Sequence, residues 1–88
     1  MVTRQVTIKN RTGLHARPAS NFVLEAKKYE SKIQVRRLDS EAVNAKSIVM
    51  LLAEGLTQGT EIEIIADGAD EELAVGNLVM LIESGLGE

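Results

Sequence analysis

The chain has 88 residues, which suits one domain over 1–88, and it holds no cysteine, which excludes a disulfide framework, a cysteine nucleophile and a thiolate metal site. Its net charge is −3, but all ten Lys and Arg lie in residues 1–46 beside four acids, whereas residues 47–88 hold nine acids and no base. Only Phe22 and Tyr29 are aromatic, which disfavours nucleic-acid binding through stacked bases.

The start of the chain has no apolar run typical of a signal peptide. The longest mostly apolar stretch runs from Leu73 to Ile82, about half of what a membrane span needs. We therefore expect a cytoplasmic protein that does not insert into membranes.

In the first third of the chain, the apolar pattern changes from the period of a strand to that of a helix. Residues 2–8 alternate between polar and apolar, which predicts a half-buried strand. A turn follows, in which Gly13 is expected to take unusual backbone angles. From Ala16, apolar residues recur every three or four positions, which predicts a helix over about 16–28 with Pro18 in its first turn.

The middle of the chain predicts a hairpin and a short helix. Residues 32–38 form the second expected strand, and residues 41–45 a short third strand that pairs with it. Ser47 is a strong N-cap for a helix over 48–54, which Gly55 would end. The residues expected in the core of this region are Ile33, Val35, Leu51 and Leu52.

The last part predicts one strand and one helix. Residues 60–66 alternate as a fourth strand, and three acids, Asp70 to Glu72, suit the first turn of a final helix that Gly85 and Gly87 end. Its expected buried face is Ala74, Leu78, Leu81 and Ile82. The order is β-α-β-β-α-β-α, and the alternating strands favour an α+β fold, an antiparallel sheet with helices on one face and water on the other.

His15 is the only histidine, and it lies where the glycine turn meets the first predicted helix. A helix N-terminus presents free N–H groups and partial positive charge, so it favours anions. Pro18 leaves the N–H groups of Ala16 and Arg17 as the nearest free donors, and the guanidinium of Arg17 suits phosphate. An imidazole here can act as a nucleophile toward phosphorus. The alternative is that His15 is a loop or capping residue and Arg17 a solvated charge.

The segment Gly13 to Ala19 (GLHARPA) resembles the active-site signature of HPr, the histidine-containing phosphocarrier of the bacterial phosphoenolpyruvate-dependent sugar phosphotransferase system. A second segment, Val43 to Ile48 (VNAKSI), resembles the regulatory serine motif of that family. The resemblance covers the whole chain in length and element order. It implies an open-faced β-sandwich, in which three helices cover one face of a four-stranded antiparallel sheet.

The resemblance also implies what the site does. His15 would accept a phosphoryl group on Nδ1 from phospho-enzyme I, as a pros-phosphohistidine, and pass it to a sugar-specific enzyme IIA domain. Arg17 would stabilise the phosphoryl charge. The protein would be a carrier and not an enzyme on its own, with no cofactor and no metal site, since one histidine without cysteine could not build one.

Ser47 has two interpretations, an N-cap and, by the resemblance, a regulatory site for HPr kinase/phosphorylase, with a transcriptional regulator among the partners. The sequence departs from the Gram-positive pattern at Met50, where glycine is usual, and at Glu54, which replaces an apolar residue. The loop 38–41 is similar to that of the nitrogen-related branch, NPr. A nitrogen-related carrier and a regulatory module acting through phospho-Ser47 therefore stay open as alternatives.

The resemblance assigns partner docking to the first two helices, and we expect Ile48 and Val49 at that surface. Five basic residues come from segments that the resemblance places near His15 and Ser47. They predict a basic face that steers an acidic partner. These residues are Arg11, Arg17, Lys27, Lys28 and Lys46.

Overall fold

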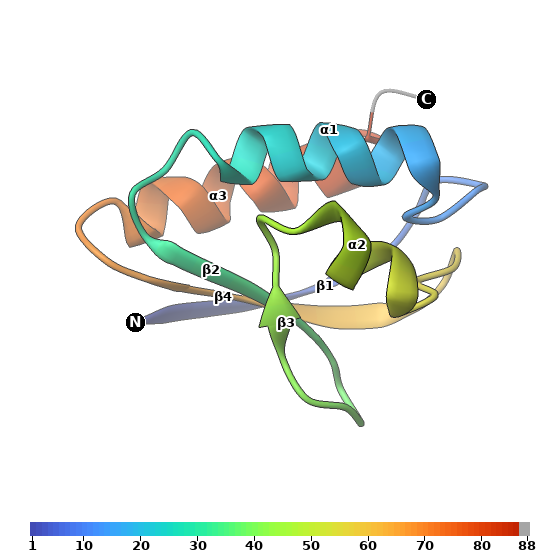
Figure 1. The fold of residues 1–88 in the computed structure, drawn as a ribbon, viewed down its shortest axis with the longest axis horizontal. Helices are drawn as coiled ribbons and strands as arrows, with labels where there is room; N and C mark the ends of the chain where they lie inside the picture. The colour runs from blue at the N-terminus through green and yellow to red at the C-terminus, as the bar shows by residue number, and fades with distance from the viewer. Residues whose placement is uncertain (87–88) are drawn as a thin grey trace.

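The computed structural model describes residues 1–86, which form seven helices and strands in the expected order (Figure 1). Gly85 follows the last helix as expected, whereas the second expected stop, Gly87, lies outside the described residues. The elements are β1 (Val2–Thr7), α1 (Ala16–Ala26), β2 (Lys32–Arg37), β3 (Val43–Asn44), α2 (Ile48–Ala53), β4 (Glu61–Asp67) and α3 (Glu71–Glu83).

The strands form one four-stranded sheet in the order β1-β4-β2-β3, and every pairing is antiparallel. The last strand, β4, therefore lies in the interior of the sheet between β1 and β2. Figure 1 shows α1 and α3 side by side over one face of the sheet, and α1 contacts α2 as well. The opposite face is polar, for example where Arg36 and Glu63 form an ion pair at 2.9 Å. The predicted α+β fold with helices on one face is confirmed.

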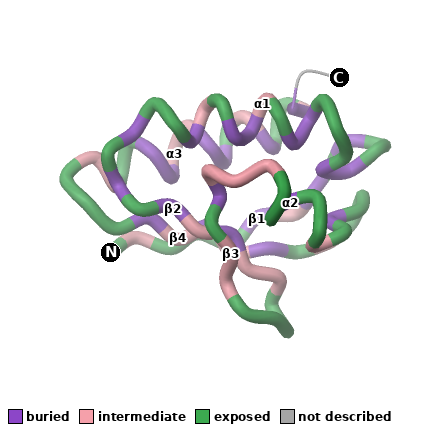
Figure 2. Tube along the Cα trace, viewed as in Figure 1, coloured by how far each residue is buried: buried purple, intermediate pink, exposed green. Residues whose placement is uncertain are grey.

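Burial concentrates between the helices and the sheet (Figure 2). In β4, Ile62, Ile64 and Ala66 are fully buried, whereas Glu61 and Asp67 at its ends are exposed. The period-2 pattern read from this segment is thus confirmed. Other large and fully buried side chains are Ile8, Phe22, Ile33, Leu51, Leu78 and Ile82.

One packing prediction is wrong, and a second is met only in part. Leu52 is 43% exposed although Leu51 beside it is fully buried, because α2 has six residues and packs on one side only. Leu81 is half-buried and packs against the core, and the inner face of α3 also includes Val75 and Val79. Adjacent helical residues differ by about 100° in direction, so an apolar run does not say which of two neighbours faces the core.

Two predicted elements are longer than the observed ones by more than one residue. The first helix ends at Ala26, with Lys27 as its C-cap, and not near residue 28. The third strand has two residues in place of the five expected over 41–45: Asn44 and Val43 pair with β2, and the Ala45 N–H just after them donates to the Ile33 carbonyl at 2.9 Å.

Asp70, in the loop before α3, forms hydrogen bonds with the loop between α1 and β2. Its carboxylate accepts the backbone N–H groups of Glu30 (2.9 Å) and Ser31 (3.0 Å) and also the Ser31 hydroxyl. Although Asp70 stands at the N-cap of α3, its side chain makes no cap hydrogen bond there. The Ser31 hydroxyl, followed by the Glu30 N–H, holds the pKa of Asp70 below its ordinary value of 3.8.

Asp70→Asn should lower the unfolding temperature at neutral pH by several degrees. The amide turns an N–H group toward one of the backbone donors, and it lacks the carboxylate charge. A carboxyl with a depressed folded-state pKa stabilises the fold above its unfolded-state pKa, and this contribution is lost as the pH falls through the folded-state value. The difference in unfolding temperature from wild type should therefore shrink below about pH 4.

Thermal unfolding of both proteins at neutral and acidic pH tests this expectation. Asp39→Asn is the matched control, because the Asp39 side chain is 82% exposed and makes only a long contact, of 4.0 Å, with the Arg37 guanidinium. An Asp70→Asn difference that stays constant with pH would rule out the carboxylate as its cause.

Candidate functional site

The segment that leads into α1 is a tight turn held against the loop after α2. The Gly13 N–H donates to the Asn10 carbonyl at 3.0 Å, and the Leu14 N–H donates to the Leu56 carbonyl at 2.7 Å. Gly13 has a φ of +68°, as expected of a residue with unusual backbone angles. A side-chain carbon on Gly13 would also collide with the Leu56 carbonyl oxygen and the Thr57 Cα. Two backbones therefore meet here at a distance that only glycine permits.

His15 is the N-cap of α1, with an exposed side chain whose Nδ1 accepts the backbone N–H of Ala16 at 2.9 Å. A neutral imidazole carries its proton on one nitrogen only, so this hydrogen bond assigns the proton to Nε2. Nδ1 is thus the nitrogen with a lone pair. The Ala16 N–H, expected to be free, is engaged by the imidazole, whereas the Arg17 N–H is a first-turn amide without an acceptor inside the helix.

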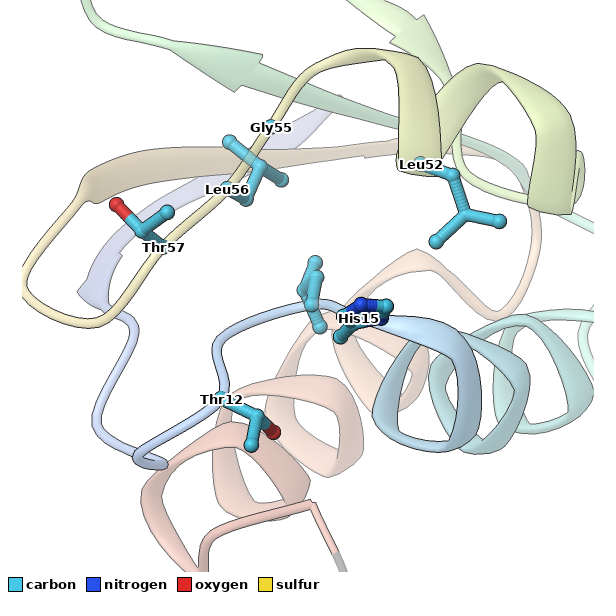
Figure 3. Close-up of a pocket in the computed structure, with 7 residues that line it drawn as sticks. Thr12, His15, Leu52, Gly55, Leu56 and Thr57 are labelled. Atoms are coloured by element: carbon cyan, nitrogen blue, oxygen red, sulfur yellow. The ribbon is translucent and has the colours of Figure 1, made fainter.

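A hollow of about 320 Å³ adjoins the imidazole (Figure 3). The turn before α1 forms one side, and the end of α2 with the loop that follows it forms the other. Leu52, which the sequence placed in the core, extends from α2 toward this hollow in Figure 3. The lining residues are Thr12, Leu14, His15, Leu52, Gly55, Leu56 and Thr57.

A second hollow of about 270 Å³, the α1–α2 groove, separates the two helices and is lined by Ala16, Ser20, Val23, Leu24, Lys27, Ile48 and Leu52. Of the two expected docking residues, Ile48 lines the groove and is half-buried, whereas Val49 is 72% exposed outside it. Sequence reasoning missed Leu24, which is 60% exposed. The sequence pattern that could have indicated Leu24 is the four-residue spacing of Ala16, Ser20 and Leu24. This spacing places the three residues in a stripe beside the buried face of the helix.

The predicted basic face is less extensive than the sequence suggested. Lys28 forms an ion pair with Glu25 at 3.0 Å, and the Lys46 ammonium donates to the Tyr29 carbonyl at 2.7 Å. Both groups are therefore engaged by other parts of the protein. The other three members of the set are exposed: Arg11, Arg17 and Lys27. Of these, Lys27 lines the α1–α2 groove.

Ser47 caps α2, as predicted. Its Oγ accepts the Met50 N–H at 3.3 Å, and its own N–H donates to the Asn44 carbonyl at 3.2 Å. His15 and Ser47 thus stand at the N-terminal ends of the two helices that border the α1–α2 groove.

Two kinds of site or segment were not found within the described part of the chain. Residues 1–86 contain no group of three or more His, Cys, Asp or Glu side chains arranged to hold a metal ion. No helix in that range is long and apolar enough to cross a membrane.

An open antiparallel sheet with three helices over one face thus carries the one histidine of the chain at the N-cap of its first helix. The family model described as "PTS HPr component phosphorylation site" matches residues 2–84. The chain therefore belongs to the HPr family of the bacterial phosphotransferase system.

Named relatives and a solved structure agree with this assignment. The chain is 44% identical over 84 residues to the phosphocarrier protein HPr of Borreliella burgdorferi, covering 96% of each chain. It is 46% identical over 84 residues to part of the multiphosphoryl transfer protein of Haemophilus influenzae; the match covers 93% of this chain but only 17% of that longer relative. Among solved structures, HPr-C-His of Thermoanaerobacter tengcongensis is 49% identical, with a TM-score of 0.95 over 100% of this chain and 98% of that one.

Proposed function

We propose that this protein is a phosphoryl carrier of the phosphoenolpyruvate-dependent sugar phosphotransferase system. His15 accepts the group from phospho-enzyme I and passes it to an enzyme IIA domain. One observation carries the proposal, the exposed imidazole whose lone-pair nitrogen, Nδ1, lies at the N-terminus of an 11-residue helix. Membership of the HPr family supports it, and so does the likeness to a relative named HPr. We place the carrier in the cytoplasm, as one domain over residues 1–88.

The chemistry follows from the position of Nδ1. Its lone pair attacks phosphorus, the N–P bond forms, and the bond from phosphorus to the donor breaks with the electron pair leaving on the donor. The proton on Nε2 stays in place. The Ala16 N–H, which bonds to Nδ1 before transfer, is then available to a phosphoryl oxygen, and the Arg17 N–H lies next to it in the chain. These first-turn donors stabilise the added negative charge. The protein is a carrier and not an enzyme on its own, because the transfer requires a donor and an acceptor protein.

The direct test is incubation with phosphoenolpyruvate, Mg²⁺ and a trace of enzyme I, followed by addition of an enzyme IIA domain. We expect one acid-labile phosphate per chain, which enzyme IIA then removes. A chain that takes up no label overturns the proposal. Parallel assays with sugar-type and nitrogen-type enzyme I distinguish the main proposal from the NPr alternative, and we expect faster labelling by the sugar type.

Arg17→Ala should slow phosphoryl transfer by roughly 10²-fold, because it removes a charged donor from the region where negative charge accumulates. Arg17→Lys should recover part of the rate, since it restores the charge without the planar pair of donors. Initial rates of transfer from phospho-enzyme I measure both effects. The control is Lys32→Ala, which removes an exposed cation from β2. A wild-type rate in Arg17→Ala would remove this residue from the mechanism.

We further propose that enzyme I and enzyme IIA dock on the α1–α2 groove, with Ile48 in its wall and Val49 at its margin. The groove combines exposed apolar side chains, Leu24 and Leu52, with the cation Lys27. This composition suits a partner surface with apolar residues surrounded by acids.

A second candidate function is regulation through Ser47, which caps the helix that borders this groove. A phosphate on its Oγ would add about −2 charge beside the docking surface and disfavour an acidic partner. HPr kinase/phosphorylase would add the group, and a transcriptional regulator would bind the product. Incubation with ATP and an HPr kinase should give an acid-stable phosphoserine and slower transfer from enzyme I. Failure to incorporate phosphate argues against this function and leaves the histidine proposal unaffected.

A further inference from the structure

Asn10 is a buried polar residue, only 5% exposed, inside the turn that precedes His15. Its Nδ2 donates to the Gly13 carbonyl and, at 3.5 Å, to the Thr12 hydroxyl. Reversing the amide would press its oxygen against the Gly13 carbonyl oxygen, so the hydrogen-bond chemistry fixes the orientation. The Asn10 Oδ1 is buried and has no hydrogen-bond partner in the part of the chain that the structure describes.

A buried acceptor without a partner is destabilising, and such groups are rare in native structures. The Oδ1 atom of Asn10 therefore destabilises the fold and does not support it. The Nδ2 atom holds a single backbone group, the Gly13 carbonyl, two residues before the reactive histidine. The Gly13 carbonyl is therefore the backbone group that the Asn10 side chain holds in place.

Gly13 precedes Arg17 by four residues. If α1 were extended by one turn toward the N-terminus, the Gly13 carbonyl would accept the Arg17 N–H as its α-helical partner. In the structure Asn10 binds this carbonyl instead, His15 keeps an extended backbone with φ −89° and ψ −167°, and α1 begins at Ala16. The contact thus opposes the helical extension that would remove the Arg17 N–H from the anion-binding end of α1.

We propose that Asn10 is a positioning residue for His15. Its hydrogen bond to the Gly13 carbonyl keeps His15 at the cap of α1 and keeps the Arg17 N–H available to a phosphoryl oxygen. The catalytic consequence rests on the proposed function, whereas the effect on the Arg17 amide does not. The rest of the turn is held by the hydrogen bond from the Leu14 N–H to the Leu56 carbonyl. Loss of the Asn10 contact should therefore change the local geometry around His15 and leave the overall fold intact.

Asn10→Asp tests this proposal with little change of shape. At about pH 8 the introduced carboxylate has no proton to donate and repels the Gly13 carbonyl, so we expect a kcat of transfer lowered by roughly 10- to 100-fold. The KM for enzyme I should stay near the wild-type value, because the α1–α2 groove is untouched. As the pH falls toward about 5, the buried carboxyl becomes protonated, donates to Gly13 again, and the ratio of variant to wild-type kcat should rise.

Two matched variants sharpen the result. Asn10→Ala removes the donor without adding a titratable group, so its kcat should be low at every pH. If Asn10→Asp does not fold at neutral pH, Asn10→Ala still tests the proposal. Asn77→Asp makes the same chemical change in α3, where the half-buried Asn77 donates to the Tyr29 hydroxyl at 2.6 Å. Its ratio to wild type should stay near one across the pH range. Asn10 variants that lose stability but keep the wild-type kcat overturn the proposal.

A second measurement does not depend on phosphoryl transfer. Titration with inorganic phosphate, followed through the Arg17 amide signal by NMR, should shift that signal in wild type and shift it much less in Asn10→Ala. If the amide responds in this way but neither protein is labelled by enzyme I, the positioning role stands and the carrier function fails. If both proteins are labelled at equal rates and the two Arg17 amides respond alike, the carrier function stands and the positioning role fails.

Discussion

His15→Ala should abolish phosphoryl acceptance from enzyme I and leave the protein folded. The imidazole is exposed, and within residues 1–86 its one hydrogen bond is with the Ala16 N–H, so the fold does not depend on it. The loss of this cap should cost about 1 kcal/mol of unfolding free energy. Label per chain after incubation with phosphoenolpyruvate and enzyme I, together with thermal unfolding, measures both effects.

His15→Asn separates the two roles of the residue. Asparagine is among the best N-capping residues but has no nucleophilic nitrogen, so this variant should regain the stability lost in His15→Ala and still take up no phosphate. Equal labelling of wild type and His15→Ala would place the phosphoryl acceptor elsewhere and overturn the carrier mechanism. Acid-stable label on either variant would indicate modification of a hydroxyl group such as that of Ser47.

Gly13→Ala should destabilise the protein strongly and displace the site. A left-handed backbone conformation costs a non-glycine residue about 1–3 kcal/mol, and forcing a carbon into closely packed backbone adds about 1–3 kcal/mol. At Gly13 both apply, because φ is +68° and a Cβ would collide with Leu56 and Thr57. The turn can relieve this collision only by moving away from the loop after α2, and His15 moves with it.

Gly55→Ala is the matched control, because Gly55 has nearly the same φ, +63°, but a Cβ there meets no atom within 4 Å. It should show the backbone strain without the collision. Urea unfolding of both variants gives the two free energies, provided that the slope with denaturant is unchanged. If the two substitutions cost the same, the close approach of the two backbones contributes nothing to stability.

The elements that the sequence predicted well are those whose signal is local. The alternation of Ile62, Ile64 and Ala66 comes from the geometry of a single strand, and all three are fully buried as expected. Ser47 and Gly13 are predicted by capping and backbone preferences, which act within a few residues, and both behave as expected. The HPr resemblance of the segment around His15 depends on residue order alone, and the family match agrees with it.

The predictions that failed are those that required knowledge of a neighbouring element. An apolar run such as 48–53 does not say which side of a six-residue helix faces α1, so Leu52 was placed in the core although it lines the groove and the hollow beside His15. Lys46 belongs to the predicted basic face, whereas its ammonium donates to the carbonyl of Tyr29 in the loop after α1. These contacts join segments that are distant in the chain, and no local pattern records them.

By itself, the sequence determined the family, the order of the elements and the sheet with helices on one face, and it predicted His15 as the residue for chemistry. Repeating periods, capping preferences and a short motif are properties of contiguous residues, so they can be read without a structure. The tertiary structure alone decided which nitrogen of His15 carries the lone pair, which side chains line the groove, and how Asn10 holds the turn. Each of these depends on distances and directions between atoms, which exist only once the chain has folded.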